Sequence, residues 1–264
     1  MQSTPTASLA EKARAKALKI QRSLDSHFDE IIKGLYLGSD PRMWSSSSSS
    51  SSSSSTDLSS MLASKGFTHR IDCTASPSNG MPGGQILVHL ITVRDKPDEA
   101  DNLWSKLEEG CDFIESAIAS KYVIFLFFSL TSFLSATSTW YSCSATVYNQ
   151  GILTTTTKFV LPSPHFSFYP FSSQSKILVH CIAGVSRSAT VILYYLMTRT
   201  SMDLNLAQAL RMVRQVRPIV SPNHGFMRLL CRVESEIIGK ESSIDPDAYE
   251  KHRHGNPGKY AVVR

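Results

Sequence analysis

The most informative stretch of the chain is ILVHCIAGVSRSATVILYYLM, at residues 177–197. The continuous apolar run at 176–181 is typical of a buried strand, and the apolar run at 188–199 predicts a helix. Between them lies a short turn of small residues that includes Gly184. Because unpaired N–H groups and the helix dipole meet at a helix N-terminus, we expect this turn to bind an anion.

Three side chains around this turn suit chemistry on a phosphate ester. Cys181 ends the strand, where the field of the helix N-terminus should lower the pKa of its thiol and favour the nucleophilic thiolate. The planar guanidinium of Arg187 can bind two phosphate oxygens. Ser188 is expected to hydrogen-bond the thiolate and to ease its departure in a second step. The alternative, a buried structural cysteine before a helix, leaves the spacing of the arginine and serine unexplained.

Strands and helices alternate over the rest of the chain. Strands are predicted at 30–39 (a pair that turns at Gly34), 67–76 and 86–93. Helices are predicted at 57–65, 98–119, 204–216 and 222–238. This alternation predicts an α/β fold with a central, mostly parallel sheet flanked by helices and with the anion-binding turn between a strand and a helix.

The nine residues HCIAGVSRS at 180–188 resemble the His-Cys-x5-Arg-Ser/Thr signature of the cysteine-dependent protein tyrosine phosphatase superfamily. The longer matches AGVSRSAT, YYLM, VRPIVSPNHGF and EIIKGLYLGS resemble the small, atypical dual-specificity phosphatases. The resemblance covers residues 28–239, outside two unusual stretches. It implies a protein-tyrosine-phosphatase-like fold and an enzyme that hydrolyses phosphotyrosine and phosphoserine/phosphothreonine in proteins.

The resemblance also implies a role for each matching residue. Cys181 would be the nucleophile that forms a cysteinyl-phosphate intermediate, and Arg187 would bind the phosphoryl group and stabilise the transition state. His180 would hold the loop and tune the thiolate. Asn223 would tie the loop to the following helix, the alternative being a structural surface residue. The expected phosphate-binding residues are Ile182, Ala183, Gly184, Val185, Ser186 and Arg187.

A general acid must also lie near the nucleophile to protonate the leaving oxygen. The resembled family places an Asp just after a strand, and the predicted strand at 86–93 is followed by Arg-Asp-Lys-Pro. Asp95 is therefore the candidate. The acidic residues at 98, 99 and 101 are instead expected to begin the next helix.

Two stretches depart from an ordinary soluble composition. Residues 45–55 are eleven consecutive serines, which we expect to be disordered. Residues 122–175 carry one charged side chain, Lys158, and 13 of the 24 aromatic residues. A single membrane crossing there would separate Asp95 from Cys181, so no transmembrane span is expected. Interfacial insertion, an apolar excursion and translated non-coding sequence remain as interpretations. The insert also raises a second hypothesis: a catalytically impaired, phosphoprotein-binding pseudophosphatase.

The predicted organisation is an N-terminal arm (1–27), a phosphatase domain (28–239) interrupted by these two stretches, and a polar tail (240–264). The uncharged loop positions favour phosphorylated proteins, signalling kinases among them, over inositol lipids. No metal or cofactor is expected, because arginine and loop amides would bind the phosphate. The net charge of +5 is spread over many sites, so no nucleic-acid partner is expected.

The five cysteines are widely spaced and form no CxxC pair, which favours a reducing compartment. We therefore expect a cytoplasmic or nuclear location. The basic, Ser/Thr-containing N-terminus leaves a mitochondrial address open.

Overall fold

The computed structural model describes residues 9–44, 55–77, 86–131, 143–145, 148–149, 152–153, 157–159 and 175–253. The chain divides into two compact units, of which the first contains residues 1–120 and 174–264 and the second residues 121–173. Most of the serine run and most of the stretch 122–175 lie outside the described residues. The interpretations of both stretches, and the domain boundaries, therefore stay predictions.

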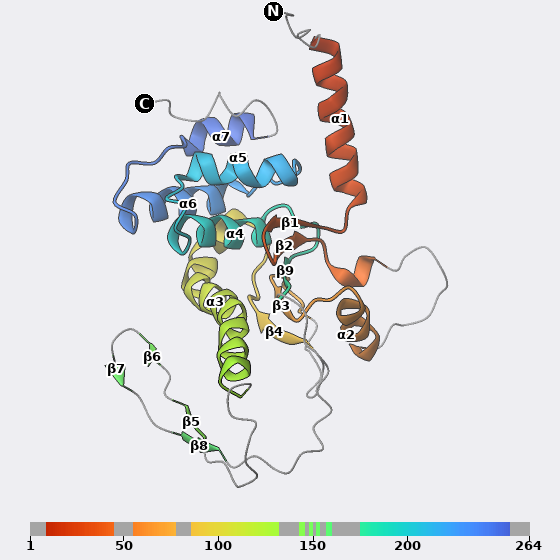
Figure 1. The fold of residues 1–264 in the computed structure, drawn as a ribbon. Coiled ribbons are helices and arrows are strands. Elements are labelled where there is room, and N and C mark those ends of the chain that lie inside the picture. Colours follow the sequence, from red (N-terminus) through yellow and green to blue (C-terminus); the bar gives the residue numbers. More distant parts are fainter. Residues whose placement is uncertain are drawn as a thin grey trace, which may run out of the picture. The chain divides into compact units, whose positions relative to one another are not determined.

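The first unit is built on a five-stranded sheet (Figure 1). In spatial order its strands are β1 (Phe28–Ile32), β2 (Leu35–Gly38), β9 (Ile177–His180), β3 (His69–Asp72) and β4 (Leu87–Leu90). Only β1 and β2 pair antiparallel, and the β2–β9, β9–β3 and β3–β4 pairs are parallel. The predicted α/β class with a mostly parallel central sheet is confirmed.

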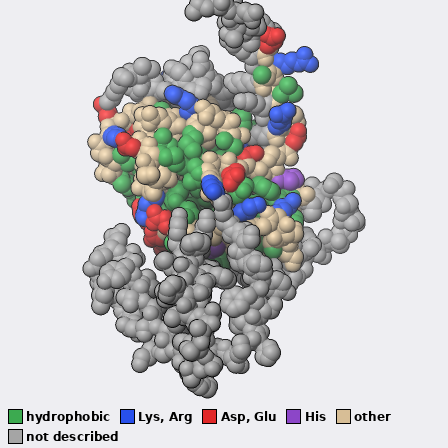
Figure 2. Space-filling view, viewed as in Figure 1, with side chains coloured by type: hydrophobic (Ala, Val, Ile, Leu, Met, Phe, Trp, Pro, Cys, Tyr) green, Lys and Arg blue, Asp and Glu red, His purple; other side chains and the backbone are tan. Residues whose placement is uncertain are grey.

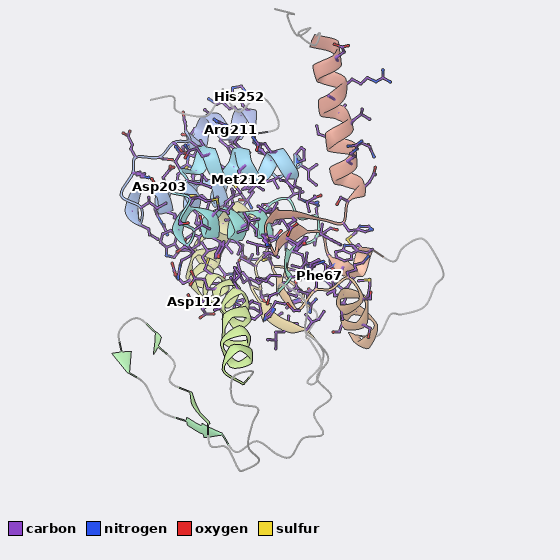
Figure 3. All side chains as sticks on the ribbon, viewed as in Figure 1. Phe67, Asp112, Asp203, Arg211, Met212 and His252 are labelled. Carbon is purple, nitrogen blue, oxygen red and sulfur yellow. The ribbon has the colours of Figure 1, made fainter. Side chains whose placement is uncertain are left out.

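Helices cover both faces of this sheet because side chains alternate along each strand. On β9, Ile177 and Val179 join the large core, whereas Leu178 joins a smaller cluster on the other face. The large core takes residues from α3 (Ala100–Thr131), α4 (Arg187–Thr198), α5 (Leu206–Val216) and α6 (His224–Glu236). The smaller cluster includes Phe67, labelled in Figure 3, and packs under α2 (Ser55–Ser64).

The helix starts depend on local sequence. Asn205 caps α5 by accepting a hydrogen bond from the N–H of Gln208, whose side chain accepts one from the Asn205 N–H. Leu206, Leu210 and Val213 of α5 are buried, whereas Arg211 is exposed and Met212 half-buried (Figure 3). On the face seen in Figure 2, hydrophobic side chains gather where α4, α5 and α6 lie in Figure 1.

Four elements differ from the sequence prediction. The strands predicted at 67–76 and 86–93 are each limited to four residues, β3 and β4, which pair with each other over their whole length. The helix predicted to end at residue 119 continues to Thr131. The predicted polar tail contains helix α7 (Pro246–His252), which begins after the Asp245 cap. Tyr249 of α7 is buried in the large core and donates a hydrogen bond to the Pro222 carbonyl, so this part packs against the domain.

The remaining elements are not part of the five-stranded sheet. They are α1 (Leu9–Asp25), two 3-10 helices (Pro41–Met43 and Pro97–Glu99) and four short strands of the second unit. In that unit β5 (Cys143–Ala145) pairs with β8 (Thr157–Phe159), and β6 (Tyr148–Asn149) pairs with β7 (Ile152–Leu153), both antiparallel. None of the described helices combines the length and the apolarity needed to cross a bilayer.

Candidate active site

The turn between β9 and α4 is a loop whose backbone carbonyls accept hydrogen bonds from other segments of the chain. The Asp40 N–H donates to the carbonyl of Ile182 at 3.0 Å, and the Ser221 N–H donates to that of Val185 at 2.9 Å. The Arg217 guanidinium donates to the two carbonyls between them. Because the C=O and N–H of a trans peptide point in opposite directions, the N–H groups of residues 183–186 are turned toward the inside of the loop. This arrangement is an anion-binding nest at a helix N-terminus.

Gly184 is the residue that lets this loop curl. Its φ is +67°, a conformation that glycine adopts without steric cost. A Cβ at this position would lie 2.4 Å from the carbonyl oxygen of Gly38 on β2. Any larger residue would therefore push the loop away from the sheet.

Cys181 lies under this nest and is almost completely buried. Burial alone would raise the pKa of its thiol, but hydrogen bonds from the Ser188 hydroxyl and N–H, the charge of Arg187 and the Val185 N–H outweigh it. The pKa of Cys181 is therefore lowered. The Ser188 Oγ lies 3.2 Å from the Cys181 Sγ, as the sequence predicts for a residue that hydrogen-bonds the thiolate.

Arg187 is buried, and one end of its guanidinium is fixed. Its Nη1 donates to the carbonyls of Cys73 and Val93, each at 3.2 Å. Its Nε is buried and has no hydrogen-bond partner among the described residues. A buried N–H without a partner costs free energy, so this atom is placed to bind an anion in the nest.

Asp95 lies at the rim of the same loop, although it is 86 residues away in sequence from Cys181. Its Oδ1 accepts hydrogen bonds from the Ser186 hydroxyl at 2.7 Å and from the Asn223 side chain at 2.8 Å. Its Oδ2 lies 3.9 Å from the Arg187 Nε, and the side chain is 39% exposed. The candidate general acid therefore reaches both the nest and solvent.

The neighbouring acidic residues have other partners. Glu99 accepts hydrogen bonds from Arg94 and Asn102. Asp101 forms an ion pair with Arg232 of α6. Both lie in the turn and helix that come after Asp95, as the sequence predicts.

Asn223 connects three parts of the site. Its backbone N–H donates to the Ser186 Oγ at 3.1 Å, and its side-chain oxygen caps α6 by accepting from the Phe226 N–H at 3.0 Å. Its side-chain amide reaches Asp95. The contacts match those expected of a residue that ties the loop to the following helix.

His180 is buried beneath the loop, beside Asp72 on β3. Its Nε2 lies 3.9 Å from the Asp72 Oδ2. Burial lowers the pKa of His180 to about 4, against the opposing charge of Asp72. The imidazole is therefore neutral at physiological pH. Its backbone carbonyl accepts a hydrogen bond from the Cys73 N–H at 2.8 Å, which joins the ends of β9 and β3.

Two contributions to the site are not predicted from the sequence. Arg217 stands in the family-like match VRPIVSPNHGF, but its burial under the loop depends on the tertiary fold, so the sequence assigns it no role. Ser186 is expected to bind phosphate as part of the loop, and the sequence does not predict that its hydroxyl also donates to Asp95. Among the described residues, no group of three His, Cys, Asp or Glu side chains is arranged to hold a metal ion.

Comparison with known proteins places this loop in a family. Residues 167–236 match the family model described as dual specificity phosphatase, catalytic domain. Over 89 residues the chain is 46% identical to dual specificity protein phosphatase 14 of Mus musculus, a match that covers 30% of this chain and 44% of the relative. Over 66 residues it is 52% identical to dual specificity protein phosphatase Mpk3 of Drosophila melanogaster, covering 25% of this chain and 16% of the relative.

The matched stretches thus span less than half of each of these relatives. Among solved structures, the crystal structure of human DUSP28 aligns with 81% of this chain and 96% of its own, at 22% identity and a TM-score of 0.48. The segment matched by the family model contains the whole loop from Cys181 to Arg187 and the start of α6. This stretch of the chain, which holds the whole loop, is therefore similar to the catalytic domain of dual specificity phosphatases.

Proposed function

We propose that the protein is an active protein phosphatase that hydrolyses phosphotyrosine and phosphoserine/phosphothreonine through a cysteinyl-phosphate intermediate. One observation carries the proposal: Cys181, Arg187 and Asp95 meet at a single loop whose amides face the same side. The thiol has a lowered pKa, the guanidinium has a buried N–H with no partner among the described residues, and the carboxyl group is partly exposed.

In the first step the Cys181 Sγ attacks phosphorus and the ester P–O bond breaks. The leaving oxygen takes a proton from Asp95, whose Oδ2 accepts neither of the two hydrogen bonds made to Oδ1. The inward amides and the Arg187 Nε stabilise the charge on the three other phosphate oxygens. The products are the cysteinyl phosphate and a neutral alcohol or phenol.

In the second step a water molecule attacks phosphorus while Asp95 accepts its proton. The P–S bond breaks, inorganic phosphate forms, and the thiolate returns to the hydrogen bond from Ser188. Because that hydrogen bond stabilises the thiolate, it makes sulfur a better leaving group.

The substrates are phosphorylated proteins, signalling kinases among them. The loop offers no lysine to meet additional phosphates of an inositol lipid, and its side chain at Ile182 is apolar and 51% exposed. The reaction requires a reduced thiol, which suits a cytoplasmic or nuclear location.

The test is hydrolysis of an aryl phosphate by the full chain, with Cys181→Ser as the control for contaminating phosphatase. Turnover that this substitution abolishes supports the proposal, and turnover that survives it contradicts the proposal. A variant in which a short Gly-Ser linker replaces residues 122–173 is measured in parallel. Activity in that variant alone would show instead that the full chain is the impaired, phosphoprotein-binding form.

A further inference from the structure

We infer that Arg217 is a positioning residue of the phosphate loop: it fixes two consecutive peptide groups so that their N–H groups face the bound phosphate. This inference rests on the proposed function of the loop and extends it to a residue outside the signature. Arg217 lies just after α5, thirty residues beyond the signature arginine at 187.

All three guanidinium nitrogens of Arg217 are used within the protein. Its Nη2 donates to the Ala183 carbonyl and its Nε to the Gly184 carbonyl, each at 3.0 Å. Its Nη1 donates to the Asp29 carboxylate at 2.6 Å and to the Ser26 carbonyl at 3.3 Å. With 1% of its surface exposed, the side chain cannot also reach a substrate. Arg217 therefore acts on the loop and not on the phosphate.

The two bound carbonyls determine the direction of the next two amides. When the carbonyl of residue 183 points to Arg217, the N–H of Gly184 points to the opposite side, and the carbonyl of Gly184 directs the N–H of Val185 in the same way. The Val185 N–H is one of the groups that stabilise the Cys181 thiolate. A contact on the outer side of the loop is thus transmitted to the nucleophile through one peptide plane.

Arginine suits this position better than lysine. A planar guanidinium presents several N–H groups in a fixed fork, so one side chain can bind two neighbouring carbonyls and a carboxylate together. Lysine has a single nitrogen, so when it pairs with the Asp29 carboxylate it loses the fork that binds the two loop carbonyls. The close approach of Gly184 leaves little room for adjustment, since a Cβ there would lie 3.1 Å from the Arg217 Nη2.

Asp29 is the counter-charge that holds the Arg217 guanidinium in place. It lies on β1, 188 residues before Arg217 in sequence, and its side chain is 19% exposed. A buried arginine without a counter-charge would be costly, and the carboxylate removes that cost and fixes the orientation of the fork. The first strand of the domain therefore contributes to the shape of the catalytic loop.

The experiment compares Arg217→Lys with Arg199→Lys in the full chain. Arg199 also forms ion pairs, but its partners are Glu108, Asp112 and Glu115 of α3 and lie away from the loop. Two properties are measured: the pH dependence of Cys181 alkylation by iodoacetamide, and the dissociation constant for tungstate. Thermal unfolding of each variant shows whether it is folded.

For Arg217→Lys we expect tungstate affinity to fall by about tenfold or more, because two charge-assisted contacts that hold the nest are lost. The midpoint of Cys181 alkylation should move to higher pH by about one pH unit. Arg199→Lys should leave both properties unchanged. A folded Arg217→Lys variant with wild-type affinity and a wild-type alkylation midpoint would overturn the inference.

If Arg217→Lys does not fold, Asp29→Asn provides the second variant, since it keeps the arginine and removes only the charge that orients it. A smaller change in the same two properties is expected, and no change would again overturn the inference. If the proposed function is wrong but the inference about Arg217 is right, the measurements give a different result. The wild-type chain would bind tungstate and alkylate at low pH but would not turn over an aryl phosphate, while the effect of Arg217 on binding would persist.

Discussion

Two neighbouring strands of the sheet end in a buried cysteine, and the two thiols have opposite properties. Cys181 comes after β9 and has a lowered pKa, whereas Cys73 comes after the adjacent β3 and has a pKa raised well above its ordinary value. Burial raises the pKa at both positions. Burial alone therefore does not produce a nucleophilic cysteine. The hydrogen-bond donors around the sulfur determine whether the thiol pKa is lowered.

The difference lies in the segments that succeed the two strands. After β9 come the nest and the start of α4, and Ser188 bonds the sulfur. After β3 the chain bends so that Thr74 donates two hydrogen bonds to Asp72, and no donor reaches the Cys73 sulfur in the hydrogen bonds of the described residues. The negative charges of Cys181 and Asp72 raise the pKa of Cys73 further.

The largest predicted effect separates the two cysteines by function. Cys181→Ser should lower the turnover of an aryl phosphate by at least about 10⁴-fold, because serine lacks a thiolate nucleophile. Cys73→Ser should keep most of the activity. Steady-state rates of the purified variants test this pair, and equal losses in both would mean that the two strand ends are not functionally distinct.

The second-largest predicted effect concerns Asp95, the candidate general acid. Asp95→Asn should lower the rate for an alkyl phosphate by about 10³-fold, because a poor leaving group must be protonated as it departs. The loss should be much smaller for p-nitrophenyl phosphate, whose leaving group is stable as an anion. Asp98→Asn is the matched control on the same turn. A uniform loss across leaving groups would assign Asp95 a role other than general acid.

The third prediction tests the neutral histidine beneath the nest. The pKa of His180 is lowered to about 4 in the fold, whereas an unfolded chain would titrate near 6.5. Between these values the unfolded state binds more protons, so stability is full above about pH 6.5 and falls as the pH drops toward 4, by at most about 3 kcal/mol. Urea unfolding from pH 7 to pH 4 measures this slope, which His180→Asn should reduce.

The sequence predicts the local structure around Cys181 better than it predicts the contacts between distant segments. The strand, the glycine turn and the helix around Cys181 are contiguous, so their composition predicts the local structure and its anion-binding character. Asp95 is predicted through the family resemblance, which places an acidic residue just after a strand.

The features that escape prediction depend on contacts between distant segments. The pairing of Arg217 with Asp29 joins residues 188 positions apart, and no local pattern marks either of them. The burial of Tyr249 in α7 is similar, because the surrounding segment is polar and only the packed core shows where the ring goes.

The smallest predicted effect isolates the hydrogen bond that Cys73 lacks among the described residues. Ser188→Ala removes the hydroxyl 3.2 Å from the Cys181 Sγ and leaves the backbone N–H donors in place. We expect about a tenfold loss in the rate of intermediate breakdown, since one hydrogen bond to a charged sulfur is lost. Rapid-mixing assays should therefore show a burst of released phenol before a slower steady state. Because the hydroxyl also stabilises the free thiolate, the alkylation midpoint of Cys181 should rise toward that of an ordinary thiol. A variant with an unchanged midpoint and no burst would show that the amides and Arg187 alone distinguish Cys181 from Cys73.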